Sequence, residues 1–291
     1  MLVFETIRHA WLNEGDSMWE EATFRARIDS SDQQRRFPAT SPDVEEIDIY
    51  RRAVSGLGGE GHALVLGMTP ELRCMAGQEF GRLTSVDASA PAIDIYRDWV
   101  GPGIDEKIML EDWGSFLAQH PSTFSAVFGD GIFGNVPSGD DCFKLVDLIR
   151  RALRPGGVFV TRMAVVPPGF RAADWEFETL LARFRDNEID DAEFSLGARL
   201  FGFFEEAYDS ASSILDNAKV FDEIDAAVAR LGITEAELGV LQRSAFRGLN
   251  YLPDVPRWEE ILTGASLDFG VHPPRGKLWH QYYRIYTCRG A

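Results

Sequence analysis

This sequence has few cysteines, few basic residues and no long apolar run, and each shortage excludes a class of protein. Its three cysteines, Cys74, Cys142 and Cys288, are far apart and show no Cys-x-x-Cys spacing, so we expect free thiols rather than disulfides or a zinc site. No stretch approaches the ~20 apolar residues of a membrane-spanning helix. A membrane partner is therefore not expected.

Basic residues are scarce relative to acidic ones, with 29 Lys and Arg against 46 Asp and Glu and a formal net charge of −17. Nucleic acids and anionic membranes are bound by clustered Lys and Arg that displace counterions. We therefore expect no nucleic acid as a partner. The first five residues lack the basic and apolar regions of a signal peptide, which favours a cytoplasmic location.

The most informative segment is a predicted strand that runs directly into a helix. An apolar run at 63–66 meets Gly67, and Thr69 and Pro70 then suit the cap and first position of a helix. Open α/β sheets bind ligands at such crossings. Pro70 removes an N–H donor and Glu71 adds negative charge, so this turn disfavours phosphate and suits a ligand that carries a sulfonium or an ammonium.

Two further predicted strands end in polar or glycine residues. About 20 residues beyond Gly67, an apolar run ends at Asp87, the distance at which an acid meets ribose hydroxyls in a nucleotide-binding βαβ unit. A strand-end Asp often only caps the next helix. Residues 124–128 form the other run, which ends at 129–131 in Gly-Asp-Gly.

A Leu-Arg-Pro-Gly-Gly turn at 153–157 stops the next helical pattern and precedes another apolar strand. Together these segments resemble the class I S-adenosylmethionine (SAM)-dependent methyltransferases over roughly residues 60–166, with a return to the core at the C-terminus. The resemblance implies an α/β fold, a doubly wound and mostly parallel seven-stranded Rossmann-like sheet, with SAM as the cofactor.

The resemblance also implies a cofactor site. Gly67, Met68 and Thr69 match the loop beside the methionine part of SAM. Asp87 matches the acid that hydrogen-bonds the ribose hydroxyls, and Ala88 follows it beside the adenine.

The other implied site residues follow the third and fourth strands. Asp112 could receive the adenine amino group while Trp113 lies near the base. Gly129, Asp130 and Gly131 match the strand end that faces the methionine portion and the transferred methyl.

The glycine loop departs from the family pattern. Val65 stands where an acid is usual, and Thr69 and Glu71 replace the second and third glycines. Thr69 could supply a hydroxyl or N–H, and Glu71 could meet the ammonium of SAM. A nicotinamide-dependent oxidoreductase is the less favoured hypothesis, because this loop lacks the glycines that would bind the pyrophosphate of the nicotinamide cofactor.

The chain divides into an N-terminal helical extension at 1–58, a cofactor-binding core at 59–166 and 253–291, and a helical insertion at 167–252. We expect the last helix of the extension to start at Ser41, and the insertion to be almost wholly helical and acidic outside. The resemblance favours a lid over the substrate, against a structural cap or a dimer contact.

The predicted function is methyl transfer from SAM to a small-molecule acceptor. The alternative is a protein that binds SAM or S-adenosylhomocysteine (SAH) without transferring a methyl group. No catalytic constellation and no metal site stands out. His9, near Trp11, could help to cover the cofactor, although a lone N-terminal histidine is more often a surface residue. Asp130 is the strongest polar candidate, for positioning rather than proton transfer.

Overall fold

The structure is a computed structural model that describes residues 21–28 and 36–290. Its centre is a seven-stranded sheet in the order β3-β2-β1-β4-β5-β10-β9. Every neighbouring pair is parallel except those that β10 forms with β5 and with β9. The strands are β1 Gly59–Leu66, β2 Phe80–Asp87, β3 Glu106–Leu110, β4 Phe124–Asp130, β5 Leu153–Ala164, β9 Leu267–His272 and β10 Tyr283–Gly290. The predicted doubly wound fold is confirmed.

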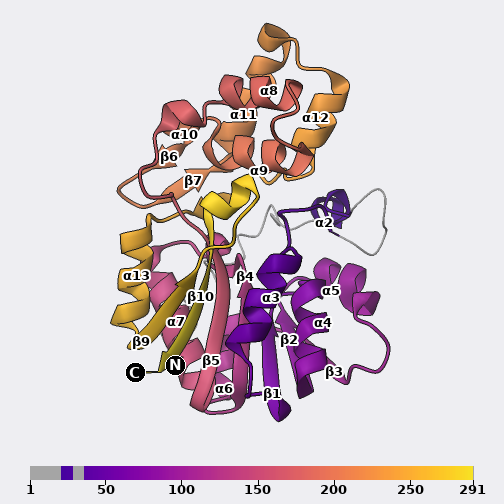
Figure 1. Cartoon of the computed structure of the whole chain (residues 1–291), viewed down its shortest axis with the longest axis vertical. Helices are drawn as coiled ribbons and strands as arrows, with labels where there is room; N and C mark the ends of the chain where they lie inside the picture. Colours follow the sequence, from indigo (N-terminus) through magenta and orange to yellow (C-terminus); the bar gives the residue numbers. More distant parts are fainter. Residues whose placement is uncertain (1–20, 29–35, 291) are drawn as a thin grey trace.

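Both faces of the sheet are buried, which explains the uninterrupted apolar runs in its central strands. Successive side chains of a strand point to opposite faces. Leu64 and Leu66 pack in the cluster of α6, α7 and α13, whereas Ala63 and Val65 pack in the cluster of α3 and α4. Figure 1 shows these two helical layers. The helices of the core are α3 Val44–Ala53, α4 Pro70–Glu79, α5 Ala90–Tyr96, α6 Trp113–Gln119, α7 Gly139–Ala152 and α13 Val255–Gly264, with short 3₁₀ turns η1 Arg97–Trp99 and η2 Ile132–Asn135.

Two helix starts differ in detail from the sequence-based expectation. Helix α3 begins two residues after the expected Pro42, because Asp43 and Glu46 form a capping box. Helix α4 does begin at Pro70, but the hydroxyl of Thr69 makes no capping hydrogen bond. That hydroxyl instead lies 3.5 Å from Oδ2 of Asp130, so it links the ends of β1 and β4.

The insertion combines helices with a small sheet. It is mostly helical, as expected, with α8 Phe177–Arg185, α9 Asp191–Phe201, α10 Phe204–Ala207, α11 Asn217–Leu231 and α12 Glu235–Gln242 after a 3₁₀ turn, η3 Ala172–Asp174. Three short strands were not expected: β6 Tyr208–Asp209, β7 Ile214–Asp216 and β8 Leu249–Tyr251. Strands of two or three residues are too short to show a period-2 pattern, which is why the sequence did not reveal them.

The insertion has its own aromatic core, which also takes up residues from distant parts of the chain. Trp175 and Phe201 are buried there. Phe37 of the extension joins this core, together with Leu278 and Trp279 of η4 Leu278–Gln281, the turn between β9 and β10. Helix α2 Glu21–Ala26 lies instead beside α5. The insertion thus sits beyond the carboxyl ends of the central strands (Figure 1).

Cys142 and Cys288 are buried, Cys74 is partly buried, and all three are free thiols, as expected. Among the described helices, none combines the length and the apolar character that crossing a bilayer would require.

Candidate cofactor site

The structure brings the predicted cofactor residues to one edge of the sheet. They follow the carboxyl ends of β1, β2, β3 and β4, four adjacent strands. In an open α/β sheet this edge, where the order of connections reverses, is the usual ligand site. His9 and Trp11 lie outside the described residues.

Gly67 places open backbone directly in front of Asp87. Its φ of +97° favours glycine, and its N–H donates to the carbonyl of Val86 at 2.8 Å. A Cβ added at Gly67 would lie 4.0 Å from Oδ2 of Asp87. A side chain there would therefore occupy the space that the carboxylate faces.

Asp87 is a partly buried acid whose carboxylate accepts one hydrogen bond from the described residues. Its Oδ1 accepts the N–H of Ser89 at 2.8 Å. Burial raises the pKa of Asp87 to about 6, although that hydrogen bond and the charge of Arg36 act in the opposite direction. Ala88, which follows it, is exposed. This carboxylate would gain from hydroxyl donors brought by a ligand.

The residues after β3 are held by local hydrogen bonds. Asp112 caps α6, where its Oδ1 accepts the N–H of Ser115 at 2.9 Å. The indole N–H of Trp113 donates to the carbonyl of Val86 at 2.8 Å. Trp113 is thereby fixed against the end of β2, next to Asp87. The role of Asp112 toward an adenine stays a prediction.

The end of β4 is engaged by partners that the sequence analysis did not identify. Asp130 accepts from Nε of Arg162 at 2.7 Å, and Arg162 also donates to Glu46 at 2.9 Å. All three side chains are almost completely buried. The carbonyl of Gly129 accepts from the hydroxyl of Tyr50 at 2.7 Å. The position of Arg162 within the buried, mostly apolar second half of β5 was the available signal for a buried ion pair.

Met68 and Glu71 have different surroundings. The side chain of Met68 is buried in a cluster with Phe24 and Tyr96, so only its backbone can line the site. Glu71 accepts from the hydroxyl of Ser41 at 3.1 Å through Oε1, while its Oε2 is buried and has no hydrogen-bond partner among the described residues. A buried carboxylate oxygen without a hydrogen-bond donor would be stabilised by a cationic group of a ligand.

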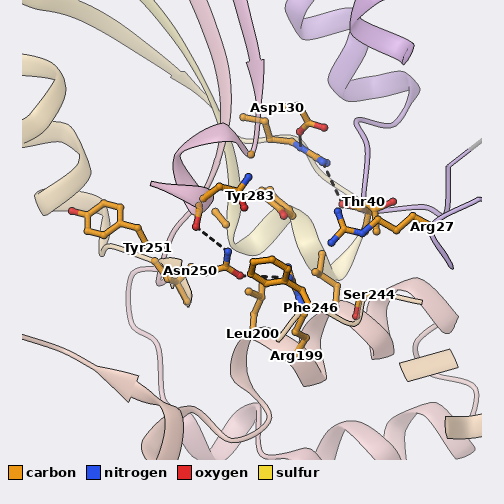
Figure 2. A pocket seen from close by; sticks show the side chains of 18 of the residues that line it. Arg27, Thr40, Asp130, Arg199, Leu200, Ser244, Phe246, Asn250, Tyr251 and Tyr283 are labelled. Atoms are coloured by element: carbon orange, nitrogen blue, oxygen red, sulfur yellow. Dashed lines mark hydrogen bonds and ion pairs between the residues drawn. The ribbon is translucent and has the colours of Figure 1, made fainter. Parts of the chain in front are cut away.

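A cavity of about 100 Å³ lies between the sheet edge and the insertion. Figure 2 shows Asp130 on the side of the sheet, and Arg199, Leu200, Ser244 and Phe246 on the side of the insertion. Gly131 also lines it, whereas Gly67, Asp87 and Asp112 do not. The structure therefore places only the β4 part of the predicted site in this cavity.

One cluster of side chains has distances that would allow it to bind a metal ion. It consists of Asp43, Glu46 and His280, in which one ligand atom of each residue lies within 4.8 Å of the others. Each already has a structural partner. Asp43 caps α3 and bonds His280 at 3.0 Å, and Glu46 pairs with Arg162. We interpret the cluster as a structural link between the extension and η4.

Known structures resemble this fold at low sequence identity. The CcbJ methyltransferase from Streptomyces caelestis is 14% identical with a TM-score of 0.55, over 94% of this chain and 100% of that one. Magnesium protoporphyrin IX methyltransferase (ChlM) from Synechocystis PCC 6803, solved with bound SAH, is 12% identical with a TM-score of 0.53, over 99% of both chains. A protein assigned to the zinc-dependent alcohol dehydrogenases of Rhodobacter sphaeroides is 13% identical with a TM-score of 0.56, over 87% of this chain and 92% of that one.

No protein-family model and no curated protein matches this sequence. At these identities structural likeness establishes the fold and not the activity. The two methyltransferase structures match this chain over 94% and 99% of its length, at TM-scores above 0.5. The chain therefore has the fold of the class I SAM-dependent methyltransferases.

Proposed function

We propose that this protein transfers a methyl group from SAM to a small-molecule acceptor. The observation that carries the proposal is the pair formed by Gly67 and Asp87. An open glycine backbone faces Oδ2 of a partly buried acid with a raised pKa, across adjacent strand ends of the methyltransferase fold. That combination suits a ligand with vicinal hydroxyls and a methionine-like chain.

The two acids at the site, Asp87 and Glu71, are complementary to the hydrogen-bond donors and the positive charge of SAM. Asp87 would accept the ribose hydroxyls, and Oε2 of Glu71 would accept the ammonium group. Pro70 and Glu71 at the start of α4 disfavour a pyrophosphate, which argues against a nicotinamide cofactor despite the similarity to an alcohol dehydrogenase. The backbone of Gly67 and Thr69 would lie beside the methionine part.

SAM supplies an electrophilic methyl group, which passes from the sulfonium to a nucleophile of the acceptor and leaves SAH behind. The protein has to align the acceptor and to exclude water, and proximity with orientation can supply about 7–11 kcal/mol of the barrier lowering. Asp130 is a positioning residue, because its carboxylate is held by Arg162 at 2.7 Å and is almost completely buried. We assign no general base.

The insertion would act as the lid of this site. It faces the carboxyl edge of the sheet, and its side chains line the cavity opposite Asp130. A negatively charged chain with a small cavity favours a small molecule over a nucleic acid or a membrane as partner. We also propose a cytoplasmic location, in keeping with the three free thiols.

A second candidate is a protein that binds SAM or SAH without methyl transfer. It is favoured by one observation. Asp130 lies at the strand end where the methyl would be transferred, and its carboxylate already accepts a hydrogen bond from Arg162. Binding alone does not separate the two candidates, since both use the same adenosyl pocket. Methyl transfer to an identified acceptor would decide between them.

Calorimetric titration of the purified protein with SAM, SAH and NAD tests the proposal. We expect SAM and SAH to bind and NAD not to bind. Binding of NAD alone would favour an oxidoreductase. If none of the three binds, the proposed function is wrong and only the fold assignment stands.

A further inference from the structure

The cavity below the insertion is lined by positive charge, although the whole chain carries −17. Its charged lining residues are four arginines and one acid: Arg27, Arg36, Arg162, Arg199 and Asp130. Asp130 is already paired with Arg162 at 2.7 Å. The guanidinium groups of Arg36 and Arg199 therefore share a space in which the one lining acid is neutralised.

Two of these guanidinium groups have weak polar contacts. Arg199 of α9 reaches Oδ1 of Asn250 only at 3.5 Å, and Arg36 reaches the hydroxyl of Thr69 only at 3.4 Å. The Nε atoms of Arg36 and Arg199 are both buried without a hydrogen-bond partner within 21–28 and 36–290. No carboxylate in those ranges forms an ion pair with either residue.

The positive charges also act on one another. Burial and the charges of Arg36 and Arg199 lower the pKa of Arg27 to about 9. Burial likewise lowers the pKa of Arg199. Charged groups held in a poorly solvated site are unfavourable unless an opposite charge accompanies them. A bound anion would supply that charge.

The polar wall near Arg199 is fixed in position. The amide of Asn250 donates to the carbonyl of Gly134 at 2.9 Å and accepts from Asn217 at 3.1 Å. Residues of the sheet edge, the extension and the insertion therefore surround one cavity of about 100 Å³. A carboxylate or phosphate group can enter this space.

We propose that the methyl acceptor is an anionic small molecule whose carboxylate or phosphate group is bound by Arg199 and Arg36 in this cavity. Guanidinium groups bind both anions through paired, charge-assisted hydrogen bonds. The cavity adjoins Asp130 and Gly131, the strand end that the proposed function places near the methyl group. An anionic acceptor would also balance the positive sulfonium. This inference rests on the proposed function for the identity of the ligand as an acceptor.

The test uses inorganic phosphate and benzoate as probes of the SAH-saturated protein, with sodium chloride at matched ionic strength as the reference. We expect one or both anions to bind, and their relative affinity distinguishes a phosphate ester from a carboxylic acid. The Arg199→Gln variant should bind the preferred anion about tenfold or more weakly. Its affinity for SAH should change less than about twofold, because Arg199 lies outside the proposed cofactor contacts, and retained SAH binding shows that the variant is folded.

Arg185→Gln is the matched control, since Arg185 is an exposed arginine of the same insertion that pairs with Glu237. It should leave both affinities unchanged. Three results would overturn the inference: neither anion binds, Arg199→Gln binds them normally, or anions bind only when SAH is absent. In the last case the arginines hold the carboxylate of the cofactor. Anion binding without any SAM or SAH binding would overturn the proposed function and leave the anion site in place.

Discussion

At the scale of single residues, the environment of Asp87 connects cofactor binding to pH. Its pKa is raised from 3.8 to about 6, chiefly by burial. The pKa of Asp87 is higher in the folded protein than in the unfolded chain. Ionisation of this carboxylate therefore destabilises the ligand-free fold as the pH rises above about 4, and this loss of stability is complete above about pH 6. Hydroxyl donors from a ligand stabilise the same ionised form.

We predict that the affinity for SAH decreases below pH 6, to about one tenth of its plateau value at pH 5, because only about a tenth of Asp87 is then ionised. Titration calorimetry between pH 5 and 8 measures this. The Asp87→Asn variant keeps the acceptor for the N–H of Ser89 and should show weak, pH-independent binding while its ligand-free form melts at a higher temperature. A pH-independent wild type would argue against the assigned role of Asp87.

At the scale of elements, the buried Arg162 network joins β4, β5 and α3. Arg162 binds Asp130 and Glu46, and its guanidinium lies 4.3 Å from the ring centroid of Tyr283. It also donates to the carbonyls of Ala39 and Ser41, which fixes the extension over the sheet edge. One side chain therefore positions both the strand end and the segment that covers it.

We predict that Arg162→Met lowers the free energy of unfolding by about 3–5 kcal/mol, because two carboxylates would be left buried without their cation. Urea denaturation measures the loss. The control is Arg150→Met, which removes a more exposed ion pair to Asp147 and should change stability by less than about 1 kcal/mol. Equal effects of the two substitutions would contradict the network as described.

At the scale of the whole molecule, η4 links the three parts of the chain. His280 bonds Asp43 of the extension at 3.0 Å, and the backbone N–H of Leu278 donates to Glu193 of the insertion at 2.8 Å. Burial disfavours the charged form of His280, but the hydrogen bond and charge of Asp43 outweigh it and raise its pKa above 6.5. The three parts thus meet at a titratable contact.

This contact should make stability depend on pH. A raised histidine pKa contributes stability that is complete below pH 6.5 and is lost as pH rises through the higher pKa of the folded state. We predict that His280→Asn lowers the melting temperature more at pH 6 than at pH 9, with a contribution of about 1 kcal/mol or less. A difference that is constant with pH would show that His280 acts only by packing.

The sequence by itself determined the alternation of strands and helices between β1 and β5, and the positions of Gly67 and Asp87 at the ends of β1 and β2. Apolar runs mark the buried strands, and the carboxyl ends of neighbouring parallel strands must meet at one edge, so local patterns were sufficient for these features. The capping box of Thr234 and Glu237 at the start of α12 is a local feature of the same kind, because it depends on residues three positions apart.

Only the tertiary structure decided the partners of Asp130 and the lining of the cavity. Arg162 meets Glu46 across 116 positions of sequence, and no local periodicity records such a contact. The arginines of the cavity come from the extension, β5 and α9, and nothing in these separate segments shows that the three lie side by side. Their shared environment exists only after the chain has folded, since burial and mutual repulsion depend on distance in space rather than on position in the sequence.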